Sequence, residues 1–128
     1  MMVKSVRDFK VVYSGLKSIV KKYEGRGLKP NPSDNPGDYT LIGPPTECSR
    51  GKEVWFGGVQ TRKNYVSYHL MPVYVFPELL DGISEELKKR MQGKSCFNFR
   101  QADRELFQEL AKLTDLGYRR FKLERLIL

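Results

Sequence analysis

Residues 53–71 read EVWFGGVQTRKNYVSYHLM and decide the fold. This stretch holds the only tryptophan and the only histidine of the chain, within its densest run of β-branched and aromatic residues. Residues of these types favour pleated, half-buried strands. Arg62, Lys63 and Asn64 interrupt the run. The stretch therefore predicts two antiparallel strands joined at a turn.

The two faces of this hairpin differ, because successive side chains of a strand point to opposite sides of a sheet. In the second strand one face carries Val66, Tyr68 and Leu70, and the other carries Tyr65, Ser67, His69 and Met71. The first face is expected to cover a core, and the second is mixed polar and aromatic. In the first strand, Gly57 and Gly58 predict a bulge or a close approach of another group to the backbone.

Amphipathic helices are expected at both ends of the chain. Apolar residues recur at spacings of three and four from Ser5 to Tyr23, and again after Asp103. Gly15 predicts close packing or a slight irregularity in the first helix, and Gly117 predicts a break or kink in the last.

Shorter elements are expected between these helices and the hairpin. The proline-rich residues 28–38 predict a surface loop that serves as a connector, and residues 39–42 predict a short strand. Ser84 is expected to cap a short helix, and residues 94–99 to form another strand, with Cys96 on one side and two phenylalanines on the other.

Composition is that of an ordinary folded protein. The 128 residues (14.9 kDa) are 40% hydrophobic and 30% charged, which predicts one domain spanning residues 1–128. No apolar run approaches the roughly 20 residues of a membrane span, and residues 1–8 have no apolar signal-peptide core. We therefore expect a cytoplasmic protein with no membrane partner.

The two cysteines, Cys48 and Cys96, have no second cysteine or histidine at ligand spacing. This pattern predicts free thiols and neither a zinc site nor a disulfide framework. Lys94 lies close to Cys96 in sequence, and a cation favours a reactive thiolate. The more usual outcome is a buried, inert cysteine, which we expect here.

Two segments carry a family resemblance: KNYVSYHLMP at residues 63–72 and LKKRMQGKSCFNF at residues 87–99. Over roughly residues 51–121 the chain resembles the YdhG-like family of small bacterial domains of unknown function. The resemblance implies an α+β domain, with helices packed on one side of a curved antiparallel sheet of about four or five strands. It implies no reaction and no catalytic residues.

Some members of the wider family are described as frataxin-like iron chaperones. Such iron binding relies on clusters of exposed Asp and Glu. In this chain Glu85-Glu86 is the only adjacent acidic pair, and three basic residues follow it closely at positions 88–90. The chain departs from an iron-binding pattern, so no metal ligand is assigned and no cofactor is expected.

His69 is the first residue to consider for chemistry, since histidine titrates near neutral pH and binds metals. Three interpretations stay open: a histidine bonded within the sheet, a ligand-pocket residue, and an acid–base catalyst, which has the least support. The candidate ligand pocket comprises Trp55, Tyr65, Tyr68, His69, Met71 and Lys94. Strand alternation prevents Tyr68 from sharing a face with Tyr65, His69 and Met71, so only one of these sets lines any one cavity.

The net charge of +8 leaves a polyanionic partner open. The basic residues are grouped as Lys21-Lys22, Arg62-Lys63, Lys88-Lys89-Arg90 and Arg119-Arg120 with Lys122. Ordinary solvated faces are the alternative interpretation, because no nucleic-acid motif accompanies them. We expect a non-catalytic binding module for a small ligand or a protein partner, as a monomer or homodimer. Metal handling and weak nucleic-acid binding are the alternatives, and an enzyme is the least supported class.

Overall fold

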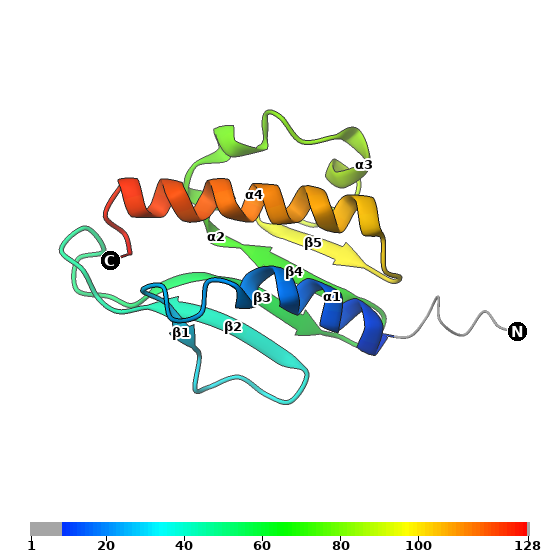
Figure 1. Cartoon of the computed structure of the whole chain (residues 1–128), viewed down its shortest axis with the longest axis horizontal. Helices are drawn as coiled ribbons and strands as arrows, with labels where there is room; N and C mark the ends of the chain where they lie inside the picture. Colours follow the sequence, from blue (N-terminus) through cyan, green and yellow to red (C-terminus); the bar gives the residue numbers. More distant parts are fainter. Residues whose placement is uncertain (1–8, 128) are drawn as a thin grey trace, which may run out of the picture.

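The computed structural model describes residues 9–127. It contains a curved, open sheet of five strands in the order β1-β2-β3-β4-β5, and every neighbouring pair is antiparallel. The two long helices, α1 (Phe9–Lys21) and α4 (Arg104–Leu123), pack against one face of this sheet (Figure 1). The predicted α+β fold is confirmed.

The sheet is a meander, in which each strand pairs with the next strand along the chain. The strands are β1 (Lys29–Pro30), β2 (Asp38–Gly43), β3 (Val54–Thr61), β4 (Val66–Leu70) and β5 (Cys96–Phe99). Between β4 and β5 the chain forms α2 (Met71–Val75), the 3₁₀ helix η2 (Pro77–Leu80) and α3 (Glu85–Lys88). The central hairpin of β3 and β4 is therefore the one that the sequence predicts.

The core lies between the helices and the sheet. Val59, Tyr68 and Phe97 pair across β3, β4 and β5, and all three are fully buried. Leu16 of α1 and Leu110 of α4 are also fully buried in this core. A slip of one residue in β4 moves Tyr68 to the other face of the sheet, so burial of this row fixes the register.

A β-bulge shapes β3. Ile42 of β2 pairs with Trp55, whereas Leu41 pairs with Gly57, so Phe56 is the extra residue. Phe56 is fully buried in the core. A Cβ atom on Gly57 would collide with the carbonyl oxygen of β4 residue 69. Both consequences expected of the two glycines, a bulge and a close backbone approach, are therefore present.

Glycine also sets how closely the helices pack. A Cβ on Gly15 would lie 2.9 Å from the Phe107 ring, which confirms the close packing predicted for α1. The kink predicted at Gly117 is wrong, because α4 continues through it to Leu123. A Cβ on Gly117 would lie 2.8 Å from Pro72 Cβ, so glycine here allows α4 to approach α2.

The cap expected at Ser84 is present, and Asp103 caps the last helix in the same way. The side chain of Ser84 accepts a hydrogen bond from the Leu87 amide, and that of Asp103 accepts one from the Leu106 amide. Both caps satisfy amides that have no partner within the helix. The predicted first residue of α1, Ser5, lies outside the described residues.

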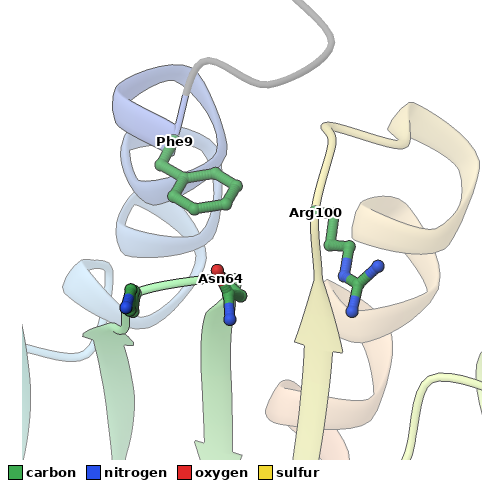
Figure 2. Close-up of a pocket in the computed structure, with 4 residues that line it drawn as sticks. Phe9, Asn64 and Arg100 are labelled. Carbon is green, nitrogen blue, oxygen red and sulfur yellow. The ribbon is translucent and has the colours of Figure 1, made fainter.

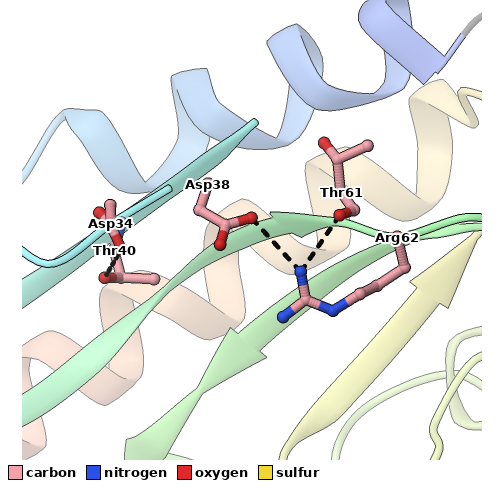
Figure 3. A network of polar contacts seen from close by, with 5 residues as sticks. All are labelled: Asp34, Asp38, Thr40, Thr61 and Arg62. Atoms are coloured by element: carbon pink, nitrogen blue, oxygen red, sulfur yellow. Dashed lines mark hydrogen bonds and ion pairs between the residues drawn. The ribbon is translucent and has the colours of Figure 1, made fainter. Parts of the chain in front are cut away.

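The proline-rich loop is more ordered than a simple connector. Its first residues form β1, an edge strand where proline is tolerated. Asp34 accepts hydrogen bonds from the Thr40 amide at 2.8 Å and from Thr40 Oγ1 at 2.7 Å (Figure 3). These two bonds hold the loop against β2.

Candidate functional site

The side of the sheet away from α1 and α4, here called the open face, carries the polar side chains of the hairpin. His69 of β4 pairs with Gly58 on one side and Cys96 on the other, and Ser67 pairs with Asn98. Alternate residues of a strand share a face, and Tyr68 faces the helices. The side chains of His69, Cys96, Ser67 and Asn98 therefore share the open face.

Trp55, His69 and Cys96 form a cluster on this face. Cys96 Sγ lies 2.9 Å from His69 Nδ1, within hydrogen-bond distance. The rings of Trp55 and His69 have centroids 5.4 Å apart and meet at 64° in an edge contact. Gly58 has no side chain to separate these two rings. All three clustered side chains are half-buried, and the sheet holds the imidazole between a thiol and an indole.

The electrostatic surroundings keep this imidazole neutral. Burial lowers the pKa of His69 below its ordinary value, and the positive charge of Arg62 lowers that pKa further, while Asp38 opposes the shift. Arg62 Nη1 lies 3.4 Å from Asp38 Oδ1 and donates to the Thr61 carbonyl at 3.1 Å (Figure 3). At pH 7 Nδ1 of a neutral His69 can therefore accept the hydrogen of the Cys96 thiol.

A cavity of about 340 Å³ lies further along β5, at Asn98 and Arg100. It is lined by Tyr65, Lys89, Arg90, Met91, Gln92, Asn98 and Arg100. The chain reaches β5 through residues 89–95 and folds back along it: the Asn98 amide donates to the Arg90 carbonyl at 2.8 Å, and the Gln92 amide donates to the Cys96 carbonyl at 2.9 Å. We call this space the cationic cavity, after Lys89, Arg90 and Arg100.

Asn98 contributes an unpaired hydrogen-bond acceptor to the wall of the cationic cavity. Its side-chain oxygen, Oδ1, is buried and has no hydrogen-bond partner in the described residues. Leaving a buried acceptor unpaired costs about 1–3 kcal/mol. Buried polar side chains usually have a partner, so the unpaired Oδ1 sets Asn98 apart from the other residues that line this cavity.

The cationic side chains differ in their pairing. Lys89 Nζ lies 3.4 Å from Glu86 Oε1, in an exposed ion pair that contributes little energy. For Arg90 and Arg100, no carboxylate of residues 9–127 lies within ion-pair distance. These two guanidinium groups are therefore available to an anion.

A second cavity, of about 260 Å³, shares Arg100 and is lined by Phe9, Lys63 and Asn64 as well. Figure 2 shows the three elements that bring these residues together: the start of α1, the turn between β3 and β4, and the chain just after β5. Positive charge from Lys63 and Arg100 thus continues from the cationic cavity around the end of the sheet.

A shallow groove of about 430 Å³ lies on the helix side, between α1 and α4. Its walls are mainly apolar and include Val11, Ile19 and Phe107. It presents few polar groups to orient a bound molecule, which small-molecule sites usually have. The open face is therefore the better candidate.

The structure brings together part of the predicted pocket. Trp55 and His69 are in contact, and Tyr65 lines the cationic cavity. These three residues all come from the hairpin that the sequence singles out. The histidine is bonded within the sheet, as one of its three interpretations expects, and its partner is Cys96.

The other three predicted residues lie elsewhere. Tyr68 is fully buried in the core, where its hydroxyl is 2.7 Å from Thr114 Oγ1 and burial raises its pKa. Met71 begins α2 and packs against the core. Lys94 is exposed in the turn before β5 and lines none of the cavities described above. Neither Tyr68 nor Lys94 therefore belongs to the site on the open face.

Three features of the site were not predicted from sequence: Asn98, Arg100 and the pairing of Cys96. Arg90 was named only within a basic group. Alternation within β5 does place Cys96 and Asn98 on the side opposite the two phenylalanines. The missing information was the pairing of β5 with β4, which brings residues 27 positions apart into contact.

No protein-family model, curated protein or solved structure matches this chain, so the resemblance to the YdhG-like family stays a prediction. Both cysteines are free, as predicted. No helix within residues 9–127 is long and apolar enough to cross a membrane. In the same residues, no three or more His, Cys, Asp or Glu side chains gather in a group that fits a metal ion.

Proposed function

We propose that this protein is a binding module for a small anionic ligand, held in the cationic cavity of the open face. The observation that carries this proposal is a cavity lined by Arg90 and Arg100, for which no carboxylate of residues 9–127 lies within ion-pair distance. Asn98, whose Oδ1 has no hydrogen-bond partner in the same residues, lines this cavity as well. One small molecule can serve both groups, if it carries an anionic group for the two guanidinium groups and a hydrogen-bond donor for Asn98.

The ligand class follows from these groups. A carboxylate or phosphate suits Arg90 and Arg100, since guanidinium groups bind such anions through paired, charge-assisted hydrogen bonds. A hydroxyl or N–H on the same molecule suits Asn98 Oδ1. Tyr65 supplies an aromatic wall. The volume of about 340 Å³ lies near the small end of ligand sites, which favours a metabolite-sized molecule over a large cofactor.

Calorimetric titration tests this proposal with three probes: inorganic phosphate, a dicarboxylate such as succinate, and a nucleoside monophosphate. Arg100→Gln is expected to weaken binding of the tightest probe by about tenfold or more, because a hydrogen bond to a charged group contributes about 1.5–3 kcal/mol. Arg50→Gln removes an equal charge from the distant loop between β2 and β3 and is expected to leave the affinity unchanged. Equal losses in the two variants would reduce the effect to net charge and contradict a defined site.

Polyanion binding is the second candidate, favoured by the position of Lys63 and Arg100 on a cavity that adjoins the first one. A short single-stranded oligonucleotide distinguishes the two functions. A polyanion site shows a steep fall in affinity with salt, because binding releases several counterions. Tight oligonucleotide binding with no binding of the small probes would favour this second candidate. We propose no metal site. Whether the cavity binds a protein partner is tested by comparing the unmodified chain with Arg100→Gln and Arg50→Gln in a pull-down experiment.

A further inference from the structure

The two free cysteines have very different surroundings. Cys48 is exposed in the loop between β2 and β3 and has no side-chain partner in the described residues. Cys96 is half-buried in β5, with its Sγ 2.9 Å from His69 Nδ1. The binding function proposed above uses neither thiol, so the pairing of Cys96 needs an explanation of its own.

The Cys96–His69 pair has the geometry of a nucleophile and its base. A thiol within hydrogen-bond reach of an imidazole, with the imidazole oriented by a further group, is the usual sign of an activated nucleophile. Here the edge contact with Trp55 orients the ring, and cross-strand pairing of β4 with β5 fixes the two backbones. The base is therefore held in place before any reagent arrives.

A place for a reagent lies next to this pair. Asn98 is two residues after Cys96 on the same face of β5, which corresponds to roughly 7 Å along a strand. Asn98 lines the cationic cavity, whose volume of about 340 Å³ has room for a small molecule. Cys96 does not itself line the cavity, but its side chain lies on the same face of the sheet, two residues along β5 from a residue that does.

We infer that Cys96 is a nucleophile that reacts with small disulfides by thiol–disulfide exchange, with His69 as its base. Cys96 Sγ forms a bond to one sulfur of the disulfide, and the S–S bond of the reagent breaks. The thiol proton passes to His69 Nδ1 during the attack and then to the departing half, which leaves as a thiol. Cys96 is oxidised to a mixed disulfide, and the departing half is reduced, so the small disulfide is the only co-reactant.

The rate of reaction with dithiodipyridine, a neutral disulfide, tests this inference apart from the charge of the cavity. The protein with Cys48→Ser reports on Cys96, and the protein with Cys96→Ser reports on Cys48. At pH 7 Cys96 is expected to react about tenfold faster or more, a modest gain for assistance by a general base. Exposure alone would make Cys48 the faster of the two, because Cys48 is exposed and Cys96 is half-buried.

Substitution of the base separates a chemical role from a structural one. In the Cys48→Ser background, His69→Asn keeps a hydrogen-bonding group near the Nδ1 position but removes the base, and it is expected to abolish the rate advantage. Leu116→Ala, an exposed change on α4 at the helix side of the sheet, is the control and is expected to leave the rate unchanged. Circular dichroism of each variant establishes that it is folded before its rate is compared.

The pH profile gives a second readout. An unassisted thiol reacts only as its thiolate, so the rate at Cys48 should rise steadily with pH. The rate at Cys96 should change little between about pH 6.5 and 8, because His69 is already neutral there and can accept the thiol proton. Arg62 and Asp38 are the charged groups that act on His69: Arg62 lowers its pKa and Asp38 opposes this shift. A Cys96 that reacts more slowly than Cys48, or that keeps its rate in His69→Asn, overturns the inference.

The same assay separates this inference from the proposed binding function. Dithiobis(nitrobenzoate) is a dianionic disulfide, and a functional cationic cavity should accelerate its reaction with Cys96 in a way that Arg100→Gln and added salt remove. If only this preference for the anion is absent, the binding proposal fails and the thiol–base pair stands. If the neutral reagent shows no dependence on His69, the pair fails whatever the anionic reagent does.

Discussion

Replacement of Asn98 by leucine is expected to stabilise the protein while it removes ligand binding. Asn98 Oδ1 is buried and finds no hydrogen-bond partner within residues 9–127, and such a group costs about 1–3 kcal/mol relative to a satisfied one. Leucine has nearly the shape of asparagine, so the change removes the unpaired oxygen without opening a cavity or overfilling the space. The difference in stability between the two proteins is then the cost of burying the unpaired oxygen, which the leucine variant does not have.

The expected gain in the free energy of unfolding is about 1 kcal/mol. This value is the lower end of the roughly 1–3 kcal/mol cost of an unpaired buried group, because Asn98 as a whole is only partly buried. For a chain of this length, such a gain raises Tm by roughly 4 °C. Urea denaturation followed by circular dichroism measures the gain, with an unchanged m-value as the check that the native state is intact.

Gln60→Leu is the matched control, because Gln60 is half-buried on β3 and pairs with Ser67, the cross-strand partner of Asn98. It is expected to change stability by less than about 0.5 kcal/mol, as surface substitutions usually do. The reasoning is refuted if Asn98→Leu destabilises the protein, or if the leucine variant binds the anionic probe as tightly as the unmodified chain. Either result would mean that Asn98 Oδ1 is not an unpaired acceptor that a ligand satisfies.

Three further outcomes follow from the packing and the charges. Tyr68→Phe should cost about 1 kcal/mol in urea denaturation, because it removes a buried bond to Thr114, whose Oγ1 still donates to a helix carbonyl. Gly117→Ala should destabilise by about 1 kcal/mol net, since overpacking against Pro72 costs about 1–3 kcal/mol and alanine returns about 1 kcal/mol of helix propensity. Stability should fall as pH drops from about 7 to 5, because the unfolded chain protonates His69 at about pH 6.5 and the folded chain at lower pH.

Each of these outcomes has a result that contradicts it. Gly82→Ala is the control for helix packing, since a Cβ there meets open space, and a loss equal to that of Gly117→Ala would argue against the contact with α2. A Tyr68→Phe variant as stable as the unmodified chain would remove the energetic role of its hydroxyl. If the decline below pH 7 is as steep in His69→Asn, other groups cause it.

Local signals predicted much of the fold. The alternation in residues 53–71 identified the central hairpin and the residue, Tyr68, that faces the core. The cap predicted at Ser84 marked a helix start correctly, because capping depends on residues only three positions apart. Gly117 misled because glycine has two uses, helix breaking and close packing, and only the position of Pro72 decides between them.

The candidate site was less predictable, since it depends on contacts between distant segments. The sequence pointed to Trp55, Tyr65 and His69 through their strand and residue types, and these three lie on the open face. Asn98 and Arg100 carried no local signal, because their importance comes from the segment 89–95 that folds back along β5. Strand pairing, which composition and periodicity leave open, created the site.

The most direct test of the central claim is a titration with inorganic phosphate followed in amide ¹H–¹⁵N NMR spectra of the full chain. The account predicts saturable shifts at the amides of Gln92, Asn98 and Arg100, which surround the cationic cavity, and their loss in Arg100→Gln. Shifts confined to the groove between α1 and α4, or spread evenly over the basic surface without saturation, would contradict a defined anion site on the open face.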